Sequence, residues 1–239
     1  MSQNELTIFV AASLTDAFED IAQQFESNSI NTDVVLNIAG SSQLSQQIVR
    51  GAPADVFASA NRSQIEVVVD AGVIDHQQVA LFAYNELVVV YPSTNPAQLS
   101  TLIDLARPGV KLVIAADEVP IGAYTQSFLA TASRDIVFPS SYQTDVLENV
   151  VSFEQNVRAV LNKVMLGEAD AGIVYRSDVV ASIDKDTIAI LEIPEHLNIQ
   201  AAYYIAPVQD TSLSRQFIDT VLSPTGQDIL KSYGFVPRE

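Results

Sequence analysis

Short apolar runs alternate with segments of helical periodicity along most of the chain. The first run, residues 6–12, is continuous, which is typical of a buried strand of a parallel sheet. Apolar residues at helical spacing follow between Phe18 and Phe25. Residues 33–39 and 56–58 repeat the strand pattern, and each is followed by an amphipathic segment. This alternation predicts an α/β fold with a parallel sheet.

The same alternation continues in a second region. The β-branched segment 85–91 ends at Pro92 and predicts a strand. Further strands are predicted at 110–115, 171–175 and 199–206, and helices at 101–106, 124–133, 154–165, 213–221 and 227–232. We expect the segments 85–91 and 199–206 to be two chain crossings. They would divide the chain into a discontinuous first domain of residues 1–83 and 205–239 and a second domain of residues 84–204.

Hydroxyl side chains stand at two of the predicted strand-to-helix junctions. Ser13 follows the first strand, and Ser41 follows the second within Gly40-Ser41-Ser42. Free N–H groups and the positive end of a helix dipole make such a junction a natural anion seat. An N-cap role for Ser13 alone is the competing interpretation. Because ligands of open α/β sheets bind outside the carboxyl ends of the strands, both serines are predicted to serve one site.

Seven short motifs run in order from near residue 6 to near residue 235. They are AASLT at 11–15, GSSQL at 40–44, GAPADVF at 51–57, VPIGAY at 119–124, NVR at 156–158, GIVYRSD at 172–178 and YGF at 233–235. As an ordered set they resemble the periplasmic molybdate-binding proteins of ABC importers. The resemblance implies a two-domain α/β periplasmic-binding-protein fold (type II), with two chain crossovers and the ligand in the interdomain cleft.

The resemblance also implies a function. The chain is expected to capture molybdate, and tungstate as well, outside the cytoplasm and to deliver it to a membrane ABC permease. It implies a monomer that is not an enzyme, has no catalytic residue and no cofactor, and binds metal only as the oxyanion, without direct coordination by side chains.

Five donor positions carry over by motif match. The hydroxyls of Ser13 and Ser41 would donate from the first domain, and the N–H groups of Ile121 and Val157 and the phenol of Tyr175 from the second. A fully deprotonated dianion offers only acceptors, so a shell of N–H and O–H donors is chemically suitable and does not titrate near neutrality.

Three positions depart from the family pattern. Ile121 stands where the family has a small residue, Gly40 stands where some members have Ser, and Asn156 replaces a common Asp. A second branch of the family uses carboxylates to expand the coordination of the metal. No motif of that branch is present, but Glu154 lies close to the predicted site in the sequence.

Charge and composition restrict the partners. With 12 Lys and Arg against 29 Asp and Glu, the net charge of −17 disfavours nucleic acid and anionic membranes. Because salt screens exposed charges over about 10 Å, local donors can still hold an anion. The absence of Cys excludes disulfides and thiolate sites. Residues 1–5 are too short and polar for a signal peptide, so the export that the resemblance implies would require a removed leader, for which a lipid anchor is one form.

Two other functions remain open from the residues alone. One is binding of sulfate or another tetrahedral oxyanion. The other is an α/β hydrolase or transferase that uses Ser13 or Ser41 as nucleophile. The second lacks a GxSxG elbow, a P-loop and a GxGxxG loop, and its only histidines, His76 and His196, are far apart in sequence.

Overall fold

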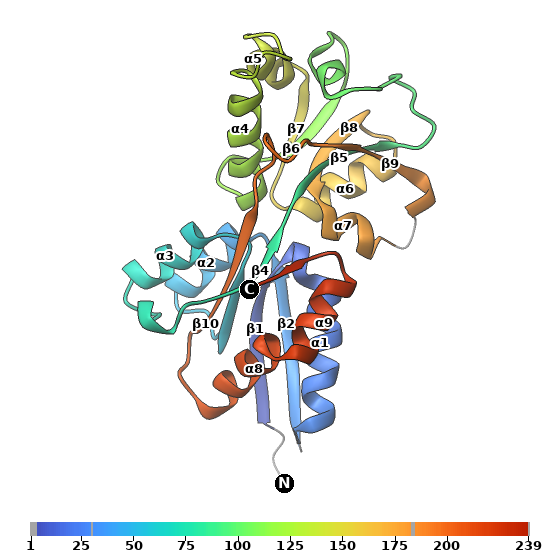
Figure 1. Ribbon diagram of the computed structural model, residues 1–239. Coiled ribbons are helices and arrows are strands. Elements are labelled where there is room, and N and C mark those ends of the chain that lie inside the picture. Colours follow the sequence, from blue (N-terminus) through green and yellow to red (C-terminus); the bar gives the residue numbers. More distant parts are fainter. Residues whose placement is uncertain (1–3, 30, 183–184, 239) are drawn as a thin grey trace. The chain divides into compact units, whose positions relative to one another are not determined.

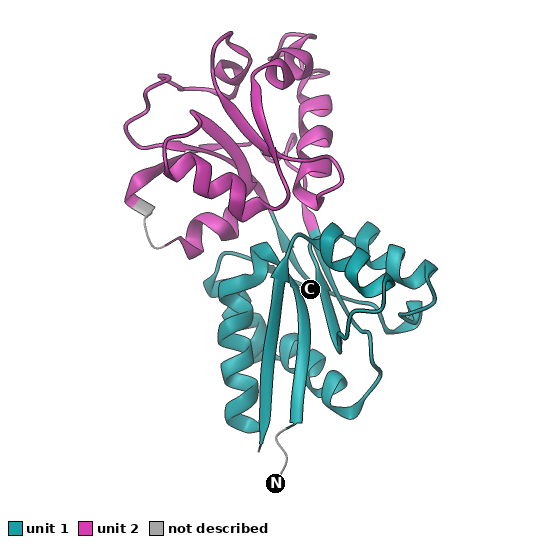
Figure 2. Ribbon diagram, turned by 180° about the vertical axis from the view of Figure 1, so that it is seen from behind, with its two compact units in different colours: residues 1–85, 202–239 teal, residues 86–201 magenta. Residues whose placement is uncertain are grey.

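The structure is a computed structural model and describes residues 4–29, 31–182 and 185–238. The chain forms two compact units: unit 1 comprises Met1–Asn85 and Ala202–Glu239, and unit 2 comprises Glu86–Ala201 (Figure 2). The chain therefore passes between the units twice, after Asn85 and after Ala201. Residues 1–3, to which the expectation of a removed leader refers, lie outside the described residues.

Unit 1 contains a six-stranded sheet in the order β11-β4-β10-β3-β1-β2. Its strands are β1 (Asn4–Ala11), β2 (Thr32–Ala39), β3 (Val56–Ser59), β4 (Ala80–Asn85), β10 (Ala201–Pro207) and β11 (Val236–Pro237). Strand β1 runs parallel to β2 and β3, as predicted, but β10 is antiparallel to β3 and β11 is antiparallel to β4. The predicted parallel strands are therefore part of a mixed sheet, because the returning strand β10 starts beside the carboxyl end of β3, with Tyr204 opposite Ser59.

Helices cover both faces of this sheet (Figure 1). Helices α2 (Ser41–Val49) and α3 (Arg62–Asp70) lie on one face, and α1 (Thr15–Asn28), α8 (Ser212–Leu222) and α9 (Pro224–Ser232) lie on the other. Two short 3-10 helices, η1 (Ala12–Leu14) and η2 (His76–Gln78), precede α1 and β4.

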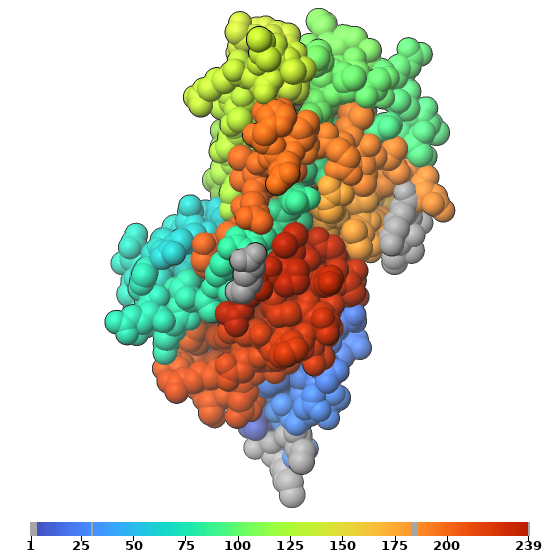
Figure 3. Space-filling view, viewed as in Figure 1, coloured from blue at the N-terminus to red at the C-terminus, as the bar shows by residue number. Residues whose placement is uncertain are grey.

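Aromatic side chains join the two ends of the chain within unit 1. The Phe217 ring of α8 lies 6.1 Å from that of Phe18 and 5.3 Å from that of Phe25, both in α1. The space-filling view shows the red C-terminal helices lying against the blue N-terminal segment (Figure 3). On the opposite face, Phe9 and Phe57 of the sheet pack in one buried cluster with residues of α2 and α3. Unit 1 thus has a core on each side of its sheet.

Unit 2 repeats the layered arrangement with five strands in the order β7-β6-β8-β5-β9. The strands are β5 (Leu87–Pro92), β6 (Leu112–Ala115), β7 (Val150–Glu154), β8 (Ala171–Tyr175) and β9 (Ile188–Glu192). Strand β6 is parallel to β7 and β8, whereas β5 is antiparallel to β8 and β9. The helices are α4 (Pro120–Ala132) and α5 (Tyr142–Glu148) on one side, α6 (Val157–Met165) and α7 (Arg176–Ala181) on the other, and the 3-10 helices η3 (Leu102–Ala106) and η4 (Lys185–Thr187).

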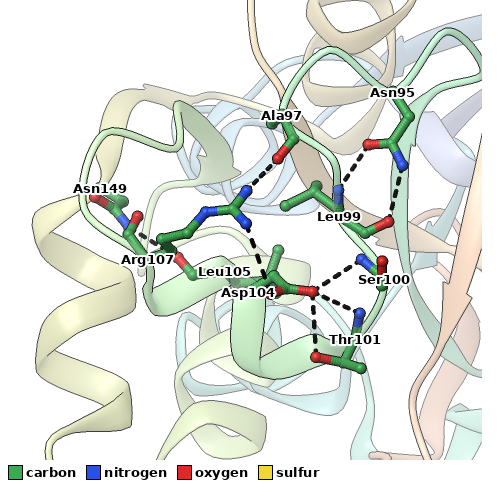
Figure 4. A network of polar contacts seen from close by, with 9 residues as sticks. All are labelled: Asn95, Ala97, Leu99, Ser100, Thr101, Asp104, Leu105, Arg107 and Asn149. Atoms are coloured by element: carbon green, nitrogen blue, oxygen red, sulfur yellow. Dashed lines mark hydrogen bonds and ion pairs between the residues drawn. The ribbon is translucent and has the colours of Figure 1, made fainter.

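Polar side-chain contacts order the segment that leads from β5 into η3 (Figure 4). One carboxylate oxygen of Asp104 accepts hydrogen bonds from the N–H groups of Ser100 and Thr101, each at 2.8 Å. These two donors hold the pKa of Asp104 below its usual range. The Asn95 side chain bonds both the N–H and the carbonyl of Leu99. The segment leading into η3 is therefore ordered by its own side chains.

Several predicted element boundaries need correction. Helix α4 begins at Pro120, not near residue 124, and α6 begins at Val157, so Glu154 belongs to strand β7. The predicted strand 85–91 corresponds to β5, except that Asn85 is the last residue of β4, a strand of unit 1 that the sequence did not predict. Within the described residues no helix is long and apolar enough to cross a membrane.

Candidate functional site

Ser13 lies in η1, directly beyond the carboxyl end of β1. Its side chain is almost fully buried, and its Oγ lies 2.9 Å from the hydroxyl oxygen of Tyr203. The N-cap interpretation of Ser13 is wrong, because Leu14 occupies the N-cap position of α1 and has no capping side chain. The Ser13 hydroxyl therefore serves a tertiary contact rather than the end of a helix.

Ser41 is the first residue of α2, after the N-cap residue Gly40. Its Oγ accepts a hydrogen bond from the Ala60 N–H at 3.1 Å, just beyond the end of β3. Because one lone pair is used in this way, the hydroxyl proton is left to be donated elsewhere. The N–H groups of Ser41 and Ser42, in the first turn of the helix, have no intrahelical carbonyl to bond.

The register of β1 and β2 brings the two serines to one edge of the unit 1 sheet. Ala11 pairs with Ala39 in parallel register, and Ser13 and Ser41 each follow two residues later. Both hydroxyls thus stand at the carboxyl ends of adjacent strands, the edge at which open α/β sheets bind ligands.

Ile121 is the second residue of α4, behind Pro120 at the first position and Val119 at the N-cap. Proline has no N–H, so the Ile121 amide is the first donor available at this helix end. The helix start is packed tightly, since a Cβ at Gly122 would lie 1.9 Å from the Ala116 carbonyl oxygen. Only glycine allows this first turn to lie so close to the end of β6, which places the Ile121 N–H at that edge.

Val157 is the first residue of α6 and is nearly buried. The side chain of the N-cap residue Asn156 accepts a hydrogen bond from the Ala159 N–H at 3.0 Å. Asn and Asp cap helices equally well, so the departure from the family at this position leaves the helix start intact. The Val157 N–H has no partner within the helix by its position.

Tyr175 is the last residue of β8 and is almost fully buried. Its N–H donates to the Asp178 carboxylate at 3.1 Å. The other oxygen of Asp178 forms an ion pair at 3.1 Å with Nε of Arg158, the residue after Val157. The start of α6 is thereby tied to the turn that carries Tyr175.

Unit 2 thus repeats the arrangement of unit 1. The predicted donors follow three neighbouring parallel strands: Ile121 follows β6, Val157 follows β7 and Tyr175 ends β8. The structure brings these three to one edge of the unit 2 sheet, and it brings Ser13 and Ser41 to the corresponding edge in unit 1.

The carboxylate of Glu154 forms an ion pair with a lysine side chain. It lies 2.6 Å from the Lys163 ammonium and also accepts from the Ser152 hydroxyl. Burial alone would raise the pKa of Glu154, but these two hydrogen bonds outweigh it and lower the pKa. Over the described ranges, no group of three or more His, Cys, Asp or Glu side chains could hold a metal ion. Glu154 is therefore a structural ion-pair partner here.

The contacts of the histidines do not favour a serine-dependent enzyme. His76 contacts Arg62, and His196 contacts Asp135 at 3.2 Å. In the part of the chain that the structure describes, the hydrogen bonds of Ser13 and Ser41 go to groups other than these imidazoles.

The sequence patterns missed three residues that support the predicted donors. Arg158 and Asp178 stand within the NVR and GIVYRSD motifs, but nothing in the spacing shows that they pair. Tyr203 lies in a segment that was interpreted only as a crossing strand. Their roles depend on contacts between residues far apart in the sequence.

Two α/β units, each with helices beginning at the carboxyl ends of its parallel strands and joined by two chain passages, define a type II solute-binding protein. The chain belongs to the bacterial extracellular solute-binding protein family, which residues 6–236 match.

Relatives with more specific descriptions share most of its length. The chain is 36% identical over 233 residues to the molybdate-binding protein ModA of Mycobacterium bovis, covering 96% of this chain and 84% of that protein. Its structure resembles the substrate-binding domain of a putative molybdenum ABC transporter from Clostridium difficile, with a TM-score of 0.70, 27% identity and coverage of 98% and 99% of the two chains. The sulfate-binding protein SubI of Mycobacterium tuberculosis, with a TM-score of 0.84 but 16% identity over 99% of this chain and 88% of SubI, shows likeness of fold alone.

Proposed function

We propose that this protein captures molybdate, and tungstate as well, outside the cytoplasm and delivers it to an ABC importer in the membrane. Support comes from the 36% identity to a molybdate-binding protein and from the 27% identity to the binding domain of a putative molybdenum transporter. The observation that carries the proposal is the donor set at the strand ends, which consists of hydroxyl and amide donors that do not titrate near neutrality.

The five proposed ligand groups come from both units. Ser13 and Ser41 donate through their hydroxyls, Ile121 and Val157 through their N–H groups, and Tyr175 through its phenol. Hydrogen bonds to an ion are about twice as strong as those between neutral groups, so such a shell holds a dianion without a cationic side chain. Neutral donors also suit a chain of net charge −17, because their effect is local.

Size separates molybdate from sulfate in this proposal. The two dianions share charge and shape, and molybdate is the larger. Donors set by strand ends and helix starts cannot contract freely, so sulfate would leave some of them stretched, each costing about 1–3 kcal/mol. Sulfate binding remains the second candidate function, since sulfate is also a tetrahedral dianion that offers only acceptors to such donors.

We also propose that the protein acts as a monomer, without a cofactor, a catalytic step or a nucleic-acid partner, and that a lipid anchor can hold it at the membrane. The net charge of −17 supports the exclusion of nucleic acid. The contacts of Ser13 and Ser41 support the exclusion of serine catalysis.

Isothermal calorimetry with molybdate, tungstate, sulfate and phosphate tests the function. We expect tight binding of molybdate and tungstate, and binding of sulfate and phosphate weaker by more than tenfold. Thermal denaturation provides the second measurement, because a ligand at 100 times its Kd stabilises the folded state by about 2.7 kcal/mol. Sulfate within tenfold of molybdate would contradict the proposed selectivity, and no heat with any of the four would contradict the function.

A further inference from the structure

Three buried polar side chains form a chain of hydrogen bonds that ends at Ser13. The Asn85 amide nitrogen donates to the hydroxyl oxygen of Tyr203 at 3.4 Å, and that oxygen lies 2.9 Å from the Ser13 Oγ. Asn85 and Tyr203 are fully inaccessible to solvent, and Ser13 is 4% exposed. Buried hydrogen bonds of this kind strengthen in a medium of low polarity, and their geometry is well defined.

The chemistry of the three groups determines which of them donates in each hydrogen bond. An amide NH₂ only donates, so the Tyr203 oxygen is an acceptor toward Asn85. A phenol has one proton, and a serine hydroxyl has one proton. When an anion accepts the proton of Ser13, the bond between Ser13 and Tyr203 must be donated by Tyr203. With an anion bound, every hydrogen bond of this series is therefore donated in one direction: from Asn85 to Tyr203, from Tyr203 to Ser13, and from Ser13 to the anion.

The Tyr203 ring is itself held firmly. It makes edge-to-face contacts with Phe82, at 6.2 Å between ring centres, and with Phe235, at 5.4 Å. A ring fixed on two sides presents its hydroxyl in one direction, so little freedom is left to lose when the anion binds.

Both chain passages contribute to this hydrogen-bond chain. Asn85 is the last residue of unit 1 before the chain leaves it, and Tyr203 lies one residue beyond Ala202, where the chain re-enters. The donor serine is thus tied to both connecting strands, β4 and β10, by polar groups that belong to unit 1 itself.

We propose that Tyr203 is a positioning residue of the anion site: it orients the Ser13 hydroxyl so that its proton faces the anion, and with Asn85 it ties this donor to both chain passages. The inference rests on the proposed function. It adds a residue that need not touch the ligand, and whose effect must pass through Ser13.

Calorimetry on a double-mutant cycle tests this dependence. The proteins are the wild type, Tyr203→Phe, Ser13→Ala and the double variant, each titrated with molybdate and each melted without ligand. We expect Tyr203→Phe to raise the Kd about tenfold, which corresponds to about 1.4 kcal/mol. In the Ser13→Ala background the same change should alter the Kd less than twofold, because the group that Tyr203 orients is absent.

Tyr142→Phe is the matched control. Tyr142 is also fully buried, and its hydroxyl donates to the Leu102 carbonyl at 2.6 Å within unit 2. Its substitution should lower the melting temperature and leave the Kd unchanged, which separates loss of a buried hydroxyl from loss of orientation at Ser13. If Tyr203→Phe does not fold, Asn85→Ala replaces it in the double-mutant cycle, because it removes the hydrogen bond that Asn85 donates to the Tyr203 hydroxyl.

The outcomes separate this inference from the proposed function. If the wild type binds molybdate and Tyr203→Phe binds equally well, the inference is wrong and the function stands. If Tyr203→Phe weakens binding equally with and without Ser13, Tyr203 acts elsewhere and the inference is again wrong. If the wild type binds no oxyanion, the function fails, and the inference fails with it.

Discussion

The carboxylate of Asp178, which is fully inaccessible to solvent, lies 3.1 Å from the Nε atom of Arg158. The same carboxylate accepts the Tyr175 N–H, so one acidic side chain joins the end of β8 to the start of α6. Two proposed donors, Tyr175 and Val157, are therefore held by one ion pair within unit 2.

Asp178→Ala should destabilise the protein. The substitution removes the acceptor of the buried Tyr175 N–H and the anionic partner of the partly exposed Arg158; a buried donor left without its acceptor costs about 1–3 kcal/mol. Equilibrium urea unfolding measures this loss. Asp210→Ala is the control, because its pair with Arg215 is exposed, and we expect its unfolding midpoint to stay nearly unchanged. Equal losses in the two variants would contradict the structural importance of Asp178.

Ser13→Ala and Ser41→Ala should each weaken molybdate binding while the protein stays folded. A hydrogen bond to a charged group is worth about 1.5–3 kcal/mol, which corresponds to a Kd raised by roughly 10- to 150-fold. Calorimetry measures the Kd, and circular dichroism checks the fold. Ser27→Ala is the control, since its exposed hydroxyl bonds the Gln24 carbonyl of its own helix. Unchanged binding in both variants would show that the anion binds elsewhere.

Val157→Pro should remove one proposed donor while keeping helix α6. Proline lacks an N–H but is well tolerated at the first position of a helix. The preceding residue, Asn156, has φ −161° and ψ 166°, an extended conformation that a following proline accepts. We expect Kd for molybdate to rise about tenfold or more.

Val157→Ala is the comparison for this proline variant, because it truncates the same buried side chain and keeps the N–H. Its Kd should stay close to that of the wild type, while its stability falls as a cavity forms. If Val157→Pro is folded and binds as tightly as Val157→Ala, the Val157 N–H is not a ligand donor.

The Tyr233 phenol should lose its proton at an unusually high pH. Its hydroxyl donates to the Asp20 carboxylate at 2.7 Å, and this hydrogen bond, with burial and the nearby negative charges, raises the pKa of Tyr233 to about 12. The protonated phenol is favoured in the folded state. Stability from this contact is therefore complete below the unfolded pKa, about 10, and is lost as the pH rises through about 12.

Ultraviolet absorbance is measured as a function of pH for the wild type and for Tyr233→Phe, and the difference between the two curves is the titration of this phenol. Asp20→Asn should move its titration back toward the ordinary range, because the acceptor then carries no charge. A Tyr233 phenol that titrates near 10 in the wild type would contradict the contact with Asp20.

The sequence predicted the local order well where a single segment carries the signal. Apolar runs located β1 and β8, the β-branched and apolar residues of 33–39 located β2, and the residues after β1 and β2 located the junctions that carry Ser13 and Ser41. Such signals are local, since burial and helical spacing act over a few residues. The ordered motifs were equally informative about the family, which the match over residues 6–236 shows.

Other helix and strand boundaries depended on side-chain contacts and strand pairing, which the spacing of apolar residues does not show. Helix α6 begins at Val157 because the Asn156 side chain caps it, and the apolar spacing could not separate this start from strand β7. The break at Glu86 separates β4 from β5, because these two strands pair with different sheets. The β-branched residues lie in β5 alone, and β4 has none, so residue type did not show where one strand ended and the next began.

The supporting contacts of the proposed site were decided only by the tertiary structure. Ser13 meets Tyr203 across 190 positions of sequence, and Arg158 meets Asp178 from another helix. The antiparallel course of β10 places Tyr203 near the end of β3, from where its hydroxyl reaches Ser13, although its own segment predicts only a strand. Residue type and spacing therefore determined which groups can donate to an anion, whereas strand order and packing determined which side chains hold those donors in place, because a hydrogen bond between distant segments exists only once the chain has folded.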